Sequence, residues 1–76
     1  MGNLKPKLKI KNNLSLLRAK KGITQQDLAN SIGVTRATVN AMERGNYNPS
    51  LELAFRLSHY FKKDIQKIFQ VEEGRE

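Results

Sequence analysis

The chain has 76 residues, 38% of them apolar and 28% charged, which suits one small globular domain with a thin core. It contains no cysteine and one histidine, so the composition excludes a disulfide framework and a cysteine–histidine metal site. The longest apolar run has three residues, whereas a membrane span needs about 20. The sequence therefore predicts no metal, no cofactor and no membrane partner.

The net charge of +7 is unevenly distributed along the chain. Residues 1–48 carry all of it, while basic and acidic residues balance in residues 49–76. A basic half of this kind favours a polyanion as partner, either a nucleic acid or an anionic membrane surface. The alternative is a charged surface that serves only solubility.

Residues 4–11 alternate apolar residues or proline with lysine, a pattern that predicts an exposed edge strand. A single strand needs a partner, and the spacing of Phe69 and Val71 makes residues 68–72 the best candidate. A disordered basic arm is the alternative for residues 1–7. We therefore predict an arm or edge strand over 1–11, a folded domain over 12–72 and a flexible tail over 73–76.

Five short helices are predicted after that segment, each preceded by a residue suited to cap it. The caps are Asn12 or Asn13, Thr24, Thr35, Ser50 and Asp64. Glycines 22, 33 and 45 end the first three helices. In the fourth helix we expect Leu51, Phe55, Leu57 and Phe61 to face the core. The predicted fold is an all-α bundle of five helices with an optional two-stranded terminal sheet.

The second and third helices are joined only by Gly33, Val34 and Thr35, which permits nothing but a tight turn between touching helices. Ala29 is small enough to let the two backbones approach closely. The apolar positions of both helices fall on one inner side, namely Leu28, Ile32, Val34, Val39 and Met42. These features predict a DNA-binding helix-turn-helix in which residues 35–44 form the recognition helix.

The outer face of the third helix consists of Arg36, Ala37, Asn40, Ala41 and Arg44. Arginine pairs with guanine and asparagine with adenine in the major groove, while alanine permits close approach and contacts thymine methyl groups. The alternative is an ordinary solvated helix face. Such faces usually mix both signs of charge, and this one has no acidic residue.

Residues 12–69 resemble the Cro/repressor-type helix-turn-helix family, also called the XRE family, whose fold is lambda-repressor-like. The resemblance rests on Leu17-Arg18, Val39, and residues 24–29 (TQQDLA), 32–35 (IGVT), 42–45 (MERG) and 48–51 (NPSL). It implies base contacts by Thr35, Arg36, Ala37, Asn40 and Ala41. It implies phosphate contacts by Thr24, Gln25, Thr38, Arg44, Tyr47 and Asn48.

Two positions depart from this family's pattern. Lys62 stands at a helix end where glycine or asparagine is preferred. Ala37 and Ala41 replace longer polar side chains of some relatives, which leaves direct base reading to Arg36 and Asn40.

Arg18 and Glu43 are charged residues on otherwise apolar helix stripes. Charged groups rarely face a core without a partner, so we predict that these two form an ion pair. The family resemblance implies the same pair.

Four apolar residues of the neutral half have no predicted place inside: Leu53, Tyr60, Ile65 and Phe69. They predict a twofold dimer through residues 53–71 that reads a palindrome with half-sites about 34 Å apart. The alternative is a monomer whose Tyr60 and Phe69 merely cover its core.

The predicted function is sequence-specific binding of double-stranded DNA by a cytoplasmic, nucleoid-associated dimeric regulator, most simply a repressor. The alternative is a protein-interaction adaptor or antitoxin-like module on the same fold. His59 stands alone, and the sequence offers no catalytic triad, phosphate-binding loop or carboxylate pair, so we predict neither an enzyme nor a small-molecule substrate.

Overall fold

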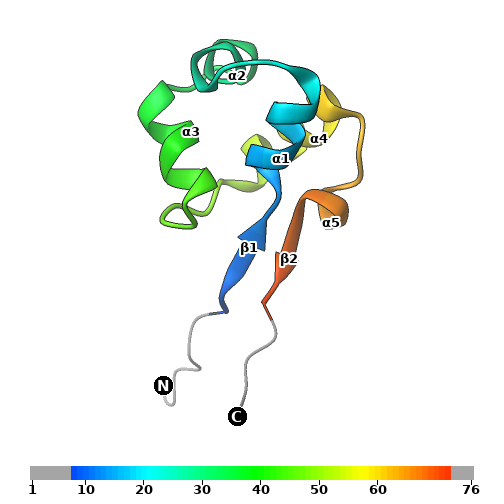
Figure 1. Cartoon of the computed structure of the whole chain (residues 1–76). Coiled ribbons are helices and arrows are strands. Elements are labelled where there is room, and N and C mark those ends of the chain that lie inside the picture. Colours follow the sequence, from blue (N-terminus) through cyan, green and yellow to red (C-terminus); the bar gives the residue numbers. More distant parts are fainter. Residues whose placement is uncertain (1–7, 73–76) are drawn as a thin grey trace.

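The computed structural model describes residues 8–72, so the predicted tail over 73–76 and most of the predicted arm lie outside the described residues. Within them the chain forms five helices and two short strands (Figure 1). The elements are β1 (Ile10–Asn12), α1 (Leu14–Lys21), α2 (Gln25–Ile32), α3 (Arg36–Glu43), α4 (Leu51–Phe61), α5 (Ile65–Ile68) and β2 (Phe69–Val71). The predicted all-α bundle with a terminal sheet is confirmed.

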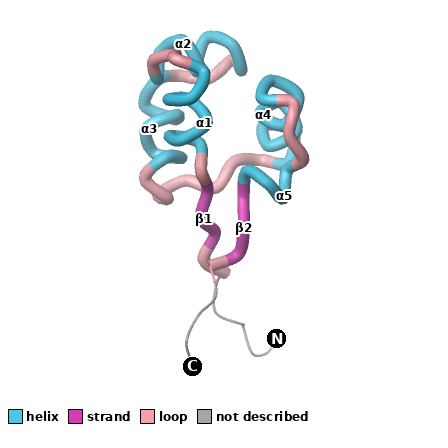
Figure 2. The backbone as a smooth tube through the Cα atoms, turned by 45° about the vertical axis from the view of Figure 1, so that its right-hand side comes forward, coloured by secondary structure: helices cyan, strands magenta, loops and turns pink. Residues whose placement is uncertain are grey.

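The helices pack around one core to which all five contribute. Figure 2 shows α1, α2 and α3 grouped together, with α4 and α5 beside them. Six large side chains in this core are less than 2% exposed: Leu14, Leu28, Val39, Met42, Leu57 and Ile68. Because residues from both ends of the chain meet here, the core ties α1 to α5 as well as α2 to α3.

Local capping explains where the helices begin. The hydroxyl oxygens of Thr24, Thr35 and Ser50 each accept a hydrogen bond from the backbone N–H three residues later, which satisfies a donor that the helix leaves free. At α1 the side chain of Asn12 performs this task, since its Oδ1 accepts from Leu14 N at 3.0 Å. Asp64 occupies the cap position of α5 without a side-chain hydrogen bond.

The strands β1 and β2 pair antiparallel, with Ile10 opposite Val71 and Asn12 opposite Phe69. The two strands project together from one end of the helical bundle (Figure 1). The predicted boundary between residues 11 and 12 falls inside β1, because Asn12 still pairs with β2 before α1 begins.

The inner face of α4 differs from the prediction. Leu53, Ala54 and Leu57 are buried, whereas Leu51 is 72% and Phe55 is 50% exposed. At 3.6 residues per turn, Leu51 and Phe55 share one row, and Leu53 and Leu57 lie on nearly the opposite side. The prediction combined residues from both rows, and packing against the bundle selects the second row.

Candidate nucleic-acid interface

A tight turn joins α2 to α3. The N–H groups of Gly33 and Val34 both donate to the carbonyl oxygen of Ala29, and Ala29 itself is fully buried. Gly33 has a φ of +78°, and an added Cβ there would lie 2.9 Å from Arg56 Nη1. Glycine is therefore favoured by the backbone conformation, and a side chain there would also displace the end of the Arg56 side chain. The turn fixes the angle at which α3 crosses α2.

The two sides of α3 differ sharply in burial. Val39 and Met42 are 0% exposed. The side chains expected to contact bases lie on the other side: Thr35, Arg36, Ala37 and Asn40 are exposed, and Ala41 is half-buried. The result is a helix that is anchored along one stripe and presents Arg36 and Asn40 to solvent along another.

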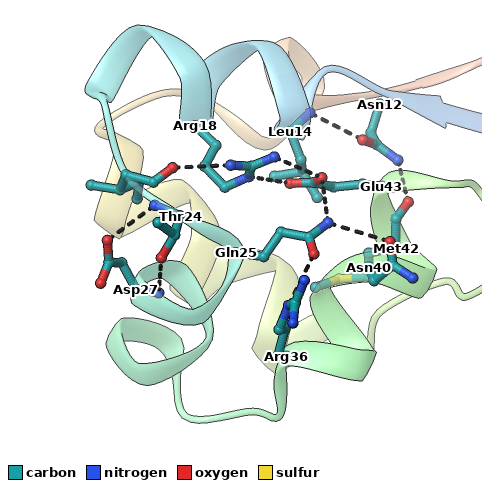
Figure 3. A network of polar contacts seen from close by, with 11 residues as sticks. Asn12, Leu14, Arg18, Thr24, Gln25, Asp27, Arg36, Asn40, Met42 and Glu43 are labelled. Carbon is teal, nitrogen blue, oxygen red and sulfur yellow. Dashed lines mark hydrogen bonds and ion pairs between the residues drawn. The ribbon is translucent and has the colours of Figure 1, made fainter.

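Glu43, the acidic residue of α3, points inward and pairs with Arg18 of α1 (Figure 3). Arg18 Nε lies 2.7 Å from Glu43 Oε2, and Arg18 Nη2 lies 3.3 Å from Glu43 Oε1. The hydrogen bond with Glu43 raises the pKa of Arg18 above its ordinary value. Arg18 Nη1 also donates to the carbonyl oxygen of Ile23. One guanidinium thus connects α1, the α1–α2 turn and α3.

Gln25, the first residue of α2, extends this network to the outer face of α3 (Figure 3). Its Nε2 donates to Glu43 Oε1 at 3.0 Å and to Asn40 Oδ1 at 3.3 Å. Its Oε1 accepts from Arg36 Nε at 3.4 Å, a long and therefore weak bond. The sequence pointed only to a phosphate contact for Gln25. Its contacts with Arg36 and Asn40 were missed, because they depend on where α2 begins relative to α3 in space.

Thr24 stands just before Gln25 and forms a reciprocal cap with Asp27. The N–H of Thr24 donates to the Asp27 carboxylate at 3.0 Å, and Thr24 Oγ1 accepts from the Asp27 N–H. The backbone hydrogen bond from Thr24 lowers the pKa of Asp27 below its ordinary value of 3.8. The cap fixes the N-terminus of α2, where helix N–H groups and the helix dipole favour an anion.

The remaining residues expected to hold phosphates lie along α3 or just beyond it. The Thr38 and Thr35 hydroxyl oxygens are 3.0 Å apart, and Thr35 Oγ1 also accepts from Thr38 N. Arg44, Tyr47 and Asn48 are exposed in the segment that follows α3. Thr24 and Gln25 lie where the helix-turn-helix begins, and these three residues lie where it ends.

The four residues expected at a dimer interface differ in how far they are buried. The prediction is wrong for Leu53, which is 7% exposed and belongs to the core, because its row on α4 is the buried one. Tyr60 and Phe69 pack against the core but are not fully buried, and Ile65 is half-buried. The Tyr60 ring also meets Phe61 edge-on at 5.0 Å.

Within residues 8–72, no helix combines the length and apolar character needed to cross a membrane. The same residues contain no cluster of three or more histidine or acidic side chains positioned for a metal ion.

Comparison with known proteins agrees with this geometry. The helix-turn-helix family matches residues 14–68. An HTH-type transcriptional regulator of Methanocaldococcus jannaschii is 45% identical over 64 residues, which cover 84% of this chain and 97% of the relative.

Solved structures share the fold. The restriction-modification controller protein C.AhdI of Aeromonas hydrophila has a TM-score of 0.66 and 33% identity, covering 72% of this chain and 83% of that one. The transcriptional regulator VanUg has a TM-score of 0.75 at 21% identity, covering 97% of this chain and 100% of that one. The turn geometry, the family match and these relatives together show that the chain belongs to the Cro/repressor-type (XRE) helix-turn-helix family of DNA-binding transcriptional regulators.

Proposed function

We propose that the protein binds specific sequences of double-stranded DNA by inserting α3 into the major groove. The observation that carries this proposal is the division of α3 into a fully buried stripe and an exposed stripe with two arginines at its ends and no acid. A rigidly anchored helix whose free side carries hydrogen-bond donors suits the edges of base pairs.

Arg36 and Asn40 are the proposed base readers. The guanidinium of Arg36 can donate two hydrogen bonds to guanine, and the amide of Asn40 can pair with adenine. Ala37 and Ala41 lie beside them and add little bulk, which permits close approach of α3 to the bases. Thr35 stands at the start of α3, where its hydroxyl caps the helix and remains exposed to solvent.

Phosphate contacts are proposed for Thr24, Gln25, Thr38, Arg44, Tyr47 and Asn48. Gln25 connects the two kinds of contact, since it bonds both Asn40 and Arg36. We therefore expect Gln25 to affect sequence preference as well as overall affinity, whereas the sequence predicted mainly the second effect.

We further propose that the protein acts as a dimer on a palindrome and represses transcription in the cytoplasm, at the nucleoid. Tyr60, Ile65 and Phe69 support the dimer, because these partly exposed apolar residues lie in the half of the chain with no net charge. Sedimentation at micromolar concentration tests it. Ile65→Asp should shift the protein toward monomers, and a wild-type chain that sediments as one species near 8.7 kDa, with or without duplex, would refute the dimer.

A second candidate function is a protein-interaction adaptor. It is favoured by the exposed Leu51 and Phe55 and by a hollow of about 450 Å³ that Phe55, His59 and Tyr60 help to line. Salt dependence separates the two functions. A plot of log affinity for DNA against log salt concentration should fall with a slope of about −0.9 for each phosphate contact. Binding to a protein partner should give a shallow slope in the same plot.

Selection of bound duplexes from a random DNA pool tests the main proposal. The full chain should enrich a palindrome with half-sites about 34 Å apart. Recovery of a sequence pool indistinguishable from the starting pool would refute sequence-specific binding.

A further inference from the structure

A polar groove of about 830 Å³ lies between β1 and the segment that follows α3. Residues 8–12 form one wall, and residues 43–48 form the other. The second wall includes Arg44, Tyr47 and Asn48, for which phosphate contacts are proposed above. The groove is therefore continuous with the proposed DNA surface and extends it toward β1.

Asn12 fixes β1 to the end of α3. Its Nδ2 donates to the carbonyl oxygen of Met42 at 2.9 Å, while its Oδ1 accepts from Leu14 N (Figure 3). The Asn12 side chain thus joins β1 to the end of the recognition helix at one end of the groove.

The groove is basic. Lys9, Lys11 and Arg44 line it, and all three are exposed. Of the two acids along it, Glu43 is already bonded to Arg18 and Gln25. Glu72 adds a second carboxylate from the chain paired with β1, where its N–H donates to the carbonyl oxygen of Lys9 at 2.7 Å, so the three cations outnumber the acids of the groove.

Lys9 and Lys11 are two residues apart in extended chain, so they share one face about 6.6 Å apart. The spacing lets the two side chains bind separate phosphates of one strand. Arg44 on the opposite wall provides a third cation.

We propose that this groove holds DNA backbone beyond the bases that α3 reads, with Lys9 and Lys11 as phosphate ligands. The inference rests on the proposed function and adds a second region of contact to it. A polyanion fits this groove better than a second copy of the chain does, because a second basic half would bring two charges of +7 together.

The test uses Lys9→Gln/Lys11→Gln in the full chain and the duplex recovered by selection. Loss of two phosphate contacts in each protomer should make the slope of log affinity against log salt shallower by about 1.8 per protomer, or about 3.6 for a dimer on the palindrome. The affinity advantage of the wild type over the variant should then shrink about 12-fold per protomer between 50 and 200 mM salt. Preference among single-base variants of the site should stay unchanged, since phosphate contacts carry no direct sequence information.

A matched control is Lys20→Gln/Lys63→Gln, which removes the same charge from exposed positions outside the groove. For this control variant, the slope of log affinity against log salt should remain that of the wild type. In a second duplex, neutral methylphosphonate linkages replace the phosphates just outside the selected bases. On this duplex the wild type and Lys9→Gln/Lys11→Gln should bind with equal affinity.

The proposal is overturned if the two double variants have the same slope, or if the neutral linkages leave the wild-type slope unchanged. A change in self-association of Lys9→Gln/Lys11→Gln without a change in slope would assign the groove to a second copy and also overturn it. These outcomes are distinct from failure of the proposed function, in which the wild type itself shows no preference for any duplex.

Discussion

Two ion pairs of this domain have the same N–O distance of 2.7 Å but very different surroundings. In the Arg18–Glu43 pair, the side chains are 21% and 7% exposed, and the pair joins α1 to α3. In the Arg56–Glu52 pair, the side chains are 51% and 75% exposed, and both belong to α4. Because water screens exposed charges and hydrates them when a partner is lost, distance alone does not indicate what each pair contributes.

The two pairs also differ in what they hold in place. Glu43 bonds Gln25, which in turn contacts Asn40 and Arg36 on the outer side of α3. Arg56 donates to the carbonyl oxygen of Ile32 and so braces the end of α2. The first pair is therefore connected to the proposed reading face, and the second supports the fold at a distance from it.

Glu43→Ala should have the largest effect on stability. It leaves the charge of Arg18 without its partner, which costs on the order of 3 kcal/mol, the lower end of the range for buried pairs, because this pair is only partly buried. In a domain of this size that loss lowers the melting temperature by about 12–24 °C. Thermal unfolding followed by circular dichroism measures it.

Glu52→Ala is the matched control, because it breaks the exposed pair and keeps the bond from Arg56 to Ile32. We expect a change within about 0.5 kcal/mol. Equal melting temperatures for the two variants would show that the Arg18–Glu43 pair has no special structural role.

Gln25→Ala should reduce DNA affinity by about 1–2 kcal/mol, through loss of a phosphate contact and of the hydrogen bonds to Asn40 and Arg36. It should also weaken preference between the selected site and its single-base variants. Fluorescence anisotropy with labelled duplexes measures both effects. Gln26→Ala is the control, since Gln26 bonds only Asn30 within α2 among the described hydrogen bonds. A Gln25→Ala protein that binds like Gln26→Ala would contradict the proposed link.

Lys62→Gly should stabilise the domain. Lys62 ends α4 with φ +57° and ψ +46°, a left-handed conformation that costs a residue with a Cβ about 1 kcal/mol or more. Glycine removes that cost, but its greater entropy in the unfolded chain opposes folding. We therefore expect the free energy of unfolding to rise by roughly 0.5 kcal/mol. A melting temperature at or below that of the wild type would show that the turn is not strained.

The smallest predicted effect is a pH dependence from the cap of α2. The pKa of Asp27 is lowered in the folded protein, so its carboxylate stabilises the fold above the unfolded pKa. That contribution disappears as pH falls from about 4 through the folded pKa. The melting temperatures of the wild type and Asp27→Asn should therefore differ most above pH 5 and converge as the pH falls through the folded pKa of Asp27. A difference that stays constant across this range would argue against the cap.

The sequence was most informative where structure depends on near neighbours. The caps at Thr24, Thr35 and Ser50 and the left-handed Gly33 follow from residues within one helical turn, and the structure has each of them. The inner side of the helix-turn-helix was also predictable, because α2 and α3 each carry one apolar stripe.

Predictions failed where several packings satisfy the same local pattern. The fourth helix has apolar residues on more than one side, so its periodicity permits either the row of Leu51 and Phe55 or the row of Leu53 and Leu57 to face inward. Contacts with the rest of the bundle decide between them. The contacts of Gln25 and of Asn12 with α3 were likewise not predictable, because they join residues 11 to 30 positions apart whose proximity depends on the complete fold.

Base discrimination by Arg36 is the most direct test of the proposed reading face. Equilibrium binding of wild type and Arg36→Ala should be measured on the selected duplex and on each single-base variant of it. We predict that Arg36→Ala loses about 1–3 kcal/mol of discrimination at one base-pair position of each half-site and keeps its preferences elsewhere. An Arg36→Ala protein that retains the full wild-type preference at every position would contradict the account.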